Sequence, residues 1–432
     1  MFQVLRKMLD VNLIRNNPEL VKKGVAAKNV NPKLVDDFLA LDEEWRKSVK
    51  EIDDLRAEQK KLSDERKIEE AVKIKNKIQL LEQDLKNLEK NREEILYCLP
   101  NLPLEDVPRG KDESENIVIK EVGEKTKFST KGGSASGGNF EPKDYLELAE
   151  NLDLIDVKRA AKVSGSRFGY IKNQAALLEF ALIQFAFNKL VQHDFVPIIP
   201  PVMIKEEMMK AMGYIDSEKD LDERYFFEKD KLFLVGTSEQ SLGPMYAEEI
   251  FNEKDLPKRY AAFSTCFRRE AGSYGKDTQG ILRVHQFDKV EMFIFSLPEN
   301  SSNEHQLILK IEEELMQELN IPYRVVQLCT GDLAQPSSST YDIEAWMPGQ
   351  NNGKGEYRET HSTSNMTDFQ ARRLSIKIRR KDGKLEFAHL LNGTAFAIGR
   401  MLIAIIENYQ QKDGSIIVPK VLQKYLNFKK IG

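Results

Sequence analysis

The chain has 432 residues, of which 41% are hydrophobic and 31% are charged, enough for two or three domains with separate cores. Its net charge of −4 excludes a global basic field, so any RNA contact would come from a local patch. The three cysteines are far apart and show no metal-ligand spacing, as expected in a reducing cytoplasm. The N-terminus is too polar for a signal peptide, and no run of about 18 apolar residues predicts a membrane span.

Residues 33–99 predict a helical arm. Apolar residues recur every three or four positions in two series, 34–62 and 71–99, and the second series is out of phase with the first. A break near Ser63-Asp64, where both residues favour a helix N-terminus, therefore fits better than one continuous helix. Two antiparallel helices of about 29 residues would each be about 43 Å long.

The outer part of this arm is basic. Such a patch on a thin projection suits contact with a phosphate backbone. A solvated helical surface and a dimerising coiled coil are the alternatives from charge alone. The basic residues are Arg56, Lys60, Lys61, Arg66, Lys67, Lys73, Lys75 and Lys77.

The rest of the chain predicts a mixed α and β domain. The tract 131–138, KGGSASGG, is typical of a flexible loop. Segments 173–193 and 303–319 predict amphipathic helices. Short alternating strands without regular intervening helices favour an antiparallel sheet, and they lie at 231–235, 260–267 and 284–295. No Walker A or GxGxxG loop is present, so a bound nucleotide would have to be held by side chains.

The segment 260–295 carries the most informative pattern. A strand ends in Phe267-Arg268-Arg269-Glu270, and a second strand places Phe287 and Glu291 on one face. An arginine, an aromatic ring and a carboxylate on adjoining strands can hold a phosphate, a flat base and an ammonium. The full run FRREAGSYGKDTQGILRVHQFDKVE resembles motif 2 of the class II aminoacyl-tRNA synthetases, in the form found in the seryl-tRNA synthetase family.

Two further segments extend the resemblance. The run 391–422 resembles motif 3 of that family, with the motif itself at about 391–410, and 175–202 resembles motif 1. The implied fold class is α+β, with an N-terminal antiparallel coiled-coil arm and a class II catalytic domain on a mostly antiparallel β-sheet flanked by helices. The implied domains are a tRNA-binding domain at 1–115 and a catalytic domain at 116–432.

The resemblance implies an ATP site. Arg268 would hold the α-phosphate and Arg400 the γ-phosphate, whereas an arginine seen alone is more often part of a structural ion pair. Phe287 would stack on adenine, and Val284 would meet the base through its main chain. The other residues expected at the nucleotide are Arg269, Glu270, Glu359, Thr360, His361 and Ser362. Glu359 and Ser362 would hold a magnesium ion bound with ATP, for which oxygen ligands are suitable.

The resemblance also implies a serine site. Thr237, Ser238 and Glu239 form the segment that contacts the α-amino group, and Arg268 would also face the serine carboxylate. Glu291 and Thr394 would read the hydroxyl, although spacing alone does not decide which glutamate reads which group. Arg268, Glu291 and Arg400 are the expected catalytic residues.

The implied activity is activation of L-serine with ATP and transfer of the seryl group to tRNA(Ser), in a cytoplasmic homodimer without a membrane partner. Service of tRNA(Sec) stays open, as does the choice of Met1 or Met8 as the start. Two alternatives are a ligase that charges a small amino acid onto a carrier protein and a non-catalytic coiled-coil interaction protein with a degenerate synthetase domain. The chain departs from the family pattern at Tyr145 and Ala149, in the absence of cysteines after Glu359, and in a slightly shorter arm.

Overall fold

The computed structural model describes residues 9–126, 128, 140–215, 218–271 and 279–432. The tract 131–138, most of the loop that follows Glu270, and both candidate start residues lie outside the described residues. The chain divides into two compact units, Met1–Pro103 and Leu104–Gly432. The domain boundary expected near residue 115 stays a prediction.

The N-terminal unit begins with two short helices, α1 (Val11–Asn16) and α2 (Pro18–Ala27). The Asp10 side chain accepts a hydrogen bond from the main-chain N–H of Asn12, which caps α1. Pro18 opens α2 at a position where its missing N–H costs nothing. Both helices pack against the base of the arm in a small apolar core.

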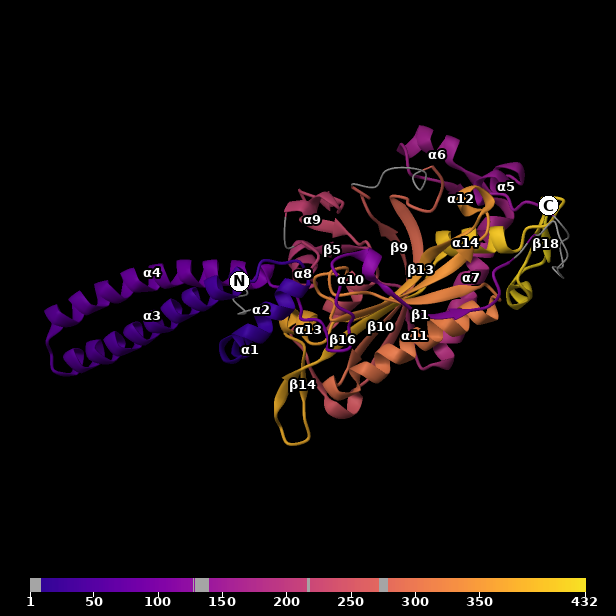
Figure 1. Ribbon diagram of the computed structural model, residues 1–432. Coiled ribbons are helices and arrows are strands. Elements are labelled where there is room, and N and C mark those ends of the chain that lie inside the picture. The colour runs from indigo at the N-terminus through magenta and orange to yellow at the C-terminus, as the bar shows by residue number, and fades with distance from the viewer. Residues whose placement is uncertain (1–8, 127, 129–139, 216–217, 272–278) are drawn as a thin grey trace. The chain divides into compact units, whose positions relative to one another are not determined.

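The arm consists of α3 (Lys33–Asp64) and α4 (Ile68–Cys98), which lie side by side as an antiparallel pair (Figure 1). Arg66 in the connection takes a left-handed conformation, with φ of 62°. The predicted helical arm is confirmed, and its break lies just after Ser63-Asp64, at residues 65–67, with Lys67 and not Ser63 or Asp64 preceding the second helix.

A buried carboxylate ties the base of the arm together. The Asp42 side chain is fully buried and accepts hydrogen bonds from Arg15 (Nε to Oδ2, 2.7 Å) and Arg92 (Nε to Oδ1, 2.8 Å). The Arg92 guanidinium lies over the rings of Phe38 and Trp45, at 5.2 and 4.9 Å. Although burial opposes ionisation of Asp42, the hydrogen bond from Arg15 and the charges of both arginines hold its pKa below its usual value.

The C-terminal unit is built on an eight-stranded sheet in the order β1-β11-β12-β13-β16-β10-β9-β4. Its neighbouring strands are antiparallel except β4 and β9, which are parallel. The strands are β1 (Ile117–Val122), β4 (Val196–Ile198), β9 (Lys258–Phe267), β10 (Gln286–Ser296), β11 (Tyr323–Gln327), β12 (Ser339–Met347), β13 (Glu356–Asn365) and β16 (His389–Ala397). The predicted α+β class with a mostly antiparallel sheet is confirmed.

Three helices cover one face of this sheet: α7 (Asn173–Gln192), α11 (Ser301–Glu318) and α14 (Ile398–Asn408) (Figure 1). Their inward side chains and those of the strands form the largest hydrophobic core. Both helices predicted from hydrophobic periodicity, at 173–193 and 303–319, are present as α7 and α11. The opposite face of the sheet is therefore left for the functional site.

Smaller elements complete the unit. The remaining helices of four or more residues are α5 (Tyr145–Asn151), α6 (Val157–Ser164), α8 (Glu206–Ala211), α9 (Glu218–Asp222), α10 (Glu239–Leu242), η2 (Gly243–Tyr246), α12 (Gln350–Gly353), α13 (Phe369–Leu374) and η6 (Lys420–Tyr425). Short strands outside the main sheet are β2 (Ile155–Asp156), β3 (Tyr170–Ile171), β5 (Met203–Lys205), β6 (Phe226–Phe227), β7 (Leu232–Leu234), β8 (Ile250–Asn252), β14 (Lys377–Arg379), β15 (Leu385–Phe387), β17 (Ile416–Ile417) and β18 (Lys430–Ile431).

Helix α7 is, by length and composition, apolar enough to cross a membrane. Its side chains Leu178, Leu182 and Phe185 are instead buried in the core against the sheet. The same helix also carries apolar side chains on its outer face, where Leu177 is 49% and Phe180 68% exposed. Helix α7 is thus a core helix with a second apolar face.

Candidate active site

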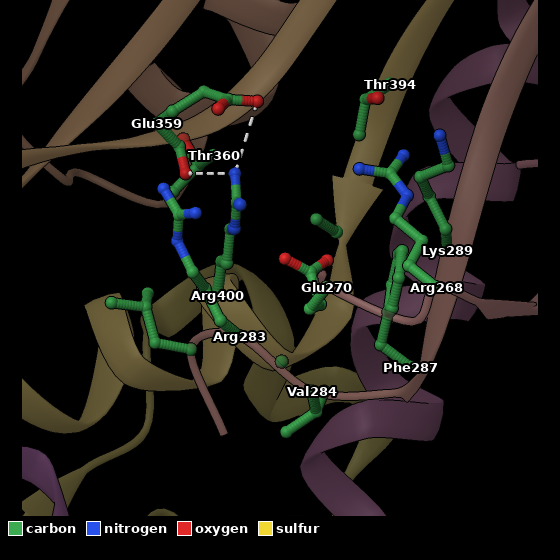
Figure 2. A pocket seen from close by; sticks show the side chains of 13 residues that line it. Arg268, Glu270, Arg283, Val284, Phe287, Lys289, Glu359, Thr360, Thr394 and Arg400 are labelled. Carbon is green, nitrogen blue, oxygen red and sulfur yellow. Dashed lines mark hydrogen bonds and ion pairs between the residues drawn. The ribbon is translucent and has the colours of Figure 1, made fainter. Parts of the chain in front are cut away.

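A cleft of about 540 Å³ opens on the face of the sheet that the three helices leave uncovered. Figure 2 shows Arg268 with Phe287 on one side of it and Arg400 with Glu359 on the other. Its lining comprises Arg268, Glu270, Leu282, Arg283, Val284, Phe287, Lys289, Glu359, Thr360, Thr394, Ala397, Gly399 and Arg400. The two arginines predicted to hold a triphosphate therefore share one cavity.

Backbone pairing fixes Arg268 at the end of β9. Its N–H donates to the main-chain oxygen of His285 at 3.0 Å, which continues the β9–β10 ladder by one residue. Its Nε donates to the main-chain oxygen of Gly236 at 3.2 Å, so the guanidinium is tied to the segment that leads into Thr237. The guanidinium carbon lies 5.4 Å from the ring centroid of Phe287. A base stacked on Phe287 and a phosphate on Arg268 would thus be neighbours.

Glu291 lies on the face of β10 that carries Phe287 and Lys289, two residues of the cleft lining. It is 1% exposed, and Thr394 on β16 is its partner in the strand register. The Nζ of Lys289 lies 2.5 Å from Glu291 Oε2, and this lysine is itself buried. An isolated buried carboxylate would be costly, so Lys289 allows Glu291 to stay charged. Because Glu291 and Thr394 are register partners on neighbouring strands, a carboxylate and a hydroxyl lie next to each other.

Glu239 is held by donors from two distant segments. Tyr214, in the loop after α8, donates its hydroxyl hydrogen to Oε2 at 2.6 Å, and Gln370 of α13 donates from Nε2 to Oε1 at 2.8 Å. Burial, with the Glu291 charge, raises the pKa of Glu239 above its usual value, although both hydrogen bonds and Lys289 act in the opposite direction. Both carboxylate oxygens of Glu239 accept hydrogen bonds, which fixes the orientation of the carboxyl group.

The neighbours of Glu239 are also buried. The Thr237 hydroxyl oxygen accepts from the N–H of Glu239 at 3.3 Å. The Ser238 hydroxyl shares a 2.7 Å hydrogen bond with that of Ser264, which directs it into the protein. Of these two hydroxyls, only that of Thr237 borders on the glutamate that is expected to read an ammonium.

Arg400 and Glu359 form an ion pair on the far side of the cleft. Arg400 Nη1 lies 3.1 Å from Glu359 Oε1 and donates to the Glu359 main-chain oxygen at 2.9 Å. The Glu359 side chain is 48% exposed, and the charges of Arg400 and Arg268 hold its pKa below the usual value. Glu359 is therefore an anion on the Arg400 side of the cleft.

The residues around Glu359 offer oxygen ligands of the kind that magnesium prefers. Ser362 hydrogen-bonds to Asp342, its partner in the register between β13 and β12. Asp342 Oδ1 is a buried carboxylate oxygen without a hydrogen-bond partner among the described residues. Burial and the nearby Glu359 charge raise the pKa of Asp342. The carboxylates of Asp342 and Glu359 repel each other, and a hard cation bound between oxygen ligands of this kind would relieve the repulsion.

Three expected nucleotide residues, Arg269, His361 and Ser362, do not line the cleft. His361 is 1% exposed, and its ring packs against Phe396 in the core on the helix-covered side, with the centroids 5.8 Å apart. Burial lowers the pKa of His361 to about 3. Arg269 directs its guanidinium over the Tyr225 ring at 5.8 Å. Val284, Phe287, Glu270 and Thr360 do line the cleft.

Besides Leu282, Ala397 and Gly399 of the lining, sequence reasoning missed five residues of this site: Tyr214, Arg283, Lys289, Asp342 and Gln370. Lys289 could have been found, because it lies between Phe287 and Glu291 on the same strand face. No local pattern around Gln370 or Asp342 indicates a contact. For Tyr214 the sequence holds no signal.

All eight basic residues predicted on the arm are exposed. Three are ion-paired: Arg56 with Glu82 at 2.8 Å, Lys67 with Glu65 at 2.8 Å, and Lys77 with Glu51 at 2.8 Å. No carboxylate of the described residues pairs with the other five, which are Lys60, Lys61, Arg66, Lys73 and Lys75. These five leave the outer part of the arm positively charged.

Comparisons with known proteins agree with these features. Residues 8–103 match the family model "Seryl-tRNA synthetase N-terminal domain", and residues 225–409 match "tRNA synthetase class II core domain (G, H, P, S and T)". The chain is 44% identical over 436 residues to a serine–tRNA ligase of Dictyoglomus turgidum, covering 98% of this chain and 99% of the relative. It is 45% identical over 451 residues to a serine–tRNA ligase of Pyrococcus horikoshii, covering 98% and 97%.

Solved structures give the same result. The crystal structure of seryl-tRNA synthetase from Pyrococcus horikoshii complexed with ATP superposes with a TM-score of 0.90 at 43% identity, over 98% of this chain and 99% of the other. A cytoplasmic serine–tRNA ligase from Naegleria fowleri in complex with AMP gives 0.88 at 32% identity, over 98% of each chain.

Proposed function

The chain belongs to the class II seryl-tRNA synthetase family, and from this premise we propose that it activates L-serine with ATP and transfers the seryl group to the 3′ end of tRNA(Ser). The observation that carries the proposal is the shared cleft of Arg268 and Arg400, which Lys289, the ion-pair partner of Glu291, also lines. The arm and the intact acidic and basic residues of the cleft do not favour a carrier-protein ligase or a non-catalytic protein.

In the first step, an oxygen of the serine carboxylate attacks the α-phosphorus of ATP, and the bond to the β-phosphate oxygen breaks. Seryl-adenylate and pyrophosphate are the products, and no general base is needed. Arg268 would neutralise the α-phosphate and Arg400 the γ-phosphate, so the residues act by positioning and charge stabilisation. Phe287 would stack on adenine beside Arg268.

The amino acid would lie between Glu239 and Glu291. Glu239 takes the ammonium, since Tyr214 and Gln370 donate to its two carboxylate oxygens and fix its position. Glu291 and Thr394 take the hydroxyl, since they are register partners and Thr394 lines the cleft. A site built to hydrogen-bond a hydroxyl rejects alanine strongly, because its buried polar groups would be left unpaired.

We also propose that Glu359 and Ser362 hold a magnesium ion bound with ATP. The unpartnered Oδ1 of Asp342 beside them supports this assignment. When bound, the ion would neutralise phosphate oxygens.

In the second step, the terminal adenosine of the tRNA takes the seryl group from the adenylate. The arm would contact the tRNA by shape and backbone, as RNA helices are generally recognised. Five exposed cations without an ion-pair partner at the outer part of the arm support this role. The domain division at 1–115 and 116–432 and the cytoplasmic location belong to the same proposal.

A homodimer is proposed from the outer face of the motif 1 segment. On α7, Leu177, Phe180 and Val191 are 49%, 68% and 51% exposed, and Val196 and Ile199 after it are 55% and 83% exposed. Contiguous exposed apolar residues of this kind mark an interaction surface. The occupant would be the same segment of a second copy, which a twofold interface places against it. Phe180→Lys should yield monomers in analytical ultracentrifugation, and a dimer of unchanged affinity would refute this interface.

The test of the activity is amino-acid-dependent ATP–pyrophosphate exchange with serine, threonine and alanine. Serine should support exchange, and alanine should support it at least about 100-fold less well in kcat/KM. Exchange that is independent of serine would contradict the proposed function. Charging of tRNA(Ser) transcripts then tests the second step, and tRNA(Sec) is included as a separate acceptor.

A further inference from the structure

The side-chain amide of Gln370 donates hydrogen bonds from its nitrogen, whereas its oxygen has no hydrogen-bond partner among the described residues. It is fully buried on α13, and its Nε2 donates to Glu239 Oε1 at 2.8 Å and to the main-chain oxygen of Met212 at 3.2 Å. Both partners are acceptors, which fixes the orientation of the amide, because the NH₂ group must face them. The Oε1 atom of Gln370 is buried and has no hydrogen-bond partner among the described residues.

This unpartnered acceptor lies beside the carboxylate that is assigned to the ammonium. Gln370 Oε1 is close to Glu239 Oε1, because Gln370 Nε2 belongs to the same amide group as Gln370 Oε1 and already donates to Glu239 Oε1. Buried acceptors are nearly always satisfied in a working complex, because an unmade hydrogen bond is costly. A ligand with a donor at this point would remove the cost.

An α-ammonium is such a ligand. It carries three N–H donors, and in a buried site each of them needs an acceptor. The Glu239 carboxylate already accepts from Tyr214 and Gln370, and the Thr237 hydroxyl oxygen already accepts from the Glu239 N–H. Gln370 Oε1, by contrast, accepts from no donor among the described residues.

We propose that Gln370 is a further specificity-determining residue, whose Oε1 accepts a hydrogen bond from the α-ammonium of the amino acid while its Nε2 holds Glu239 in place. This inference rests on the proposed function and deepens it. Gln370 thus reads the charged amino group of the substrate and excludes acids that carry no amino group.

Binding of two non-hydrolysable adenylate mimics tests the inference. One is seryl-sulfamoyl-adenosine, and the other is its deamino form, made from 3-hydroxypropionate. In the wild-type protein, the first should bind more tightly by calorimetry. Gln370→Leu should lower this preference by about 10- to 100-fold, as expected for a lost hydrogen bond to a charged group.

Tyr214→Phe is the matched comparison, because it removes the other donor to Glu239 and leaves Gln370 Oε1 intact. Its preference for the amino ligand should fall less than that of Gln370→Leu. A preference that is unchanged in Gln370→Leu, or that falls no more than in Tyr214→Phe, would overturn the inference. Gln317→Leu, on α11, serves as a control for loss of a glutamine at a distance from the cleft.

A crystal structure of the wild-type protein with seryl-sulfamoyl-adenosine decides the matter if Gln370→Leu does not fold. The serine nitrogen should lie within about 3.3 Å of Gln370 Oε1, and a longer separation would overturn the inference. If the wild-type protein binds neither mimic, the proposed function itself fails. If it prefers the amino ligand and Gln370→Leu keeps that preference, only the role of Gln370 fails.

Discussion

Arg400 and Glu359 face each other across one end of the cleft, with Arg400 Nη1 3.1 Å from Glu359 Oε1. These two residues are assigned to the γ-phosphate and to the magnesium ion. Binding of ATP with its metal would therefore exchange this ion pair for two new ones, in which each side chain meets a charge on the ligand. The pair holds both groups in the cleft at little cost, because neither is left as an isolated charge.

Glu359→Gln should weaken the metal-dependent part of catalysis. An amide is a poorer ligand for a hard cation than a carboxylate, so the magnesium concentration for half-maximal ATP–pyrophosphate exchange should rise. The control is Glu356→Gln on the same strand, where Glu356 is ion-paired with Arg358 at 3.4 Å. An equal magnesium requirement in wild-type and Glu359→Gln proteins would contradict the assignment.

Arg268→Ala should abolish ATP–pyrophosphate exchange. The variant removes the guanidinium that faces both the α-phosphate and the serine carboxylate, and loss of one such group typically costs about 100- to 1,000-fold in kcat. Arg268→Lys should recover little, because a lysine lacks the planar fork that holds Nε on Gly236 and leaves two nitrogens for the ligand. Wild-type exchange in Arg268→Ala would refute its role.

The limits of the sequence are physical. Alternation along β10 placed Phe287 and Glu291 on one face, and the strand register agrees with it. Local pattern says nothing, however, about which distant side chain meets Glu239, and Gln370 is 131 residues away from it. His361 shows a second limit: its expected place in the nucleotide site came from the family resemblance, whereas its ring packs against Phe396, next to a register shift between β12 and β13.

A shortened arm should separate the two steps. Deletion of residues 34–98 would also remove Phe38 and Leu96 from the core of the N-terminal unit. Deleting residues 49–85 and closing the gap with a short glycine–serine turn keeps the Asp42–Arg92 contact. Adenylate formation should be unchanged, and aminoacylation of tRNA(Ser) should fall at least about 100-fold. Undiminished transfer would show that the arm does not bind RNA.

Removal of a cation from the arm should weaken tRNA binding most where that cation has no ion-pair partner. Replacing Lys60, Lys61, Lys73 and Lys75 by alanine should raise the KM for tRNA and reduce its salt dependence, by roughly 0.7 to 0.9 in log–log slope for each phosphate contact removed. Lys77→Ala should have a smaller effect per residue, because Lys77 is already paired with Glu51. Equal effects would contradict a role for the unpaired cations.

Glu312 gives a prediction on stability. This α11 residue is fully buried beneath Gly393, and neither carboxylate oxygen has a hydrogen-bond partner among the described residues. Burial raises the pKa of Glu312 well above its usual value, and the charges of Glu291 and Asp342 add to the shift. The folded protein therefore keeps a proton here that the unfolded chain loses.

The sign follows from this difference in proton binding. Below the ordinary pKa of a glutamate, about 4.3, the carboxyl group is protonated in both the folded and the unfolded state. Its ionisation then makes no contribution to the free energy of unfolding. As pH rises above that value, only the unfolded state ionises, so Glu312 destabilises the fold by up to about 1.4 kcal/mol per pH unit until the folded pKa is reached. Glu312→Gln removes this effect and should raise the thermal unfolding midpoint at pH 8 more than at pH 5.

The neighbouring residue provides the control for this prediction. Glu313 accepts from the Tyr323 hydroxyl at 2.9 Å and pairs with Lys120 at 2.6 Å, so Glu313→Gln should not stabilise the protein at pH 8. A Glu312→Gln midpoint that is lower than wild type at both pH values would mean that the carboxyl has a partner in the folded protein. Glu312 lies against Gly393, the residue before Thr394, so a role in the reaction must be tested separately. If Glu312→Gln retains serine-dependent exchange, the buried carboxyl group destabilises the fold and takes no part in the reaction.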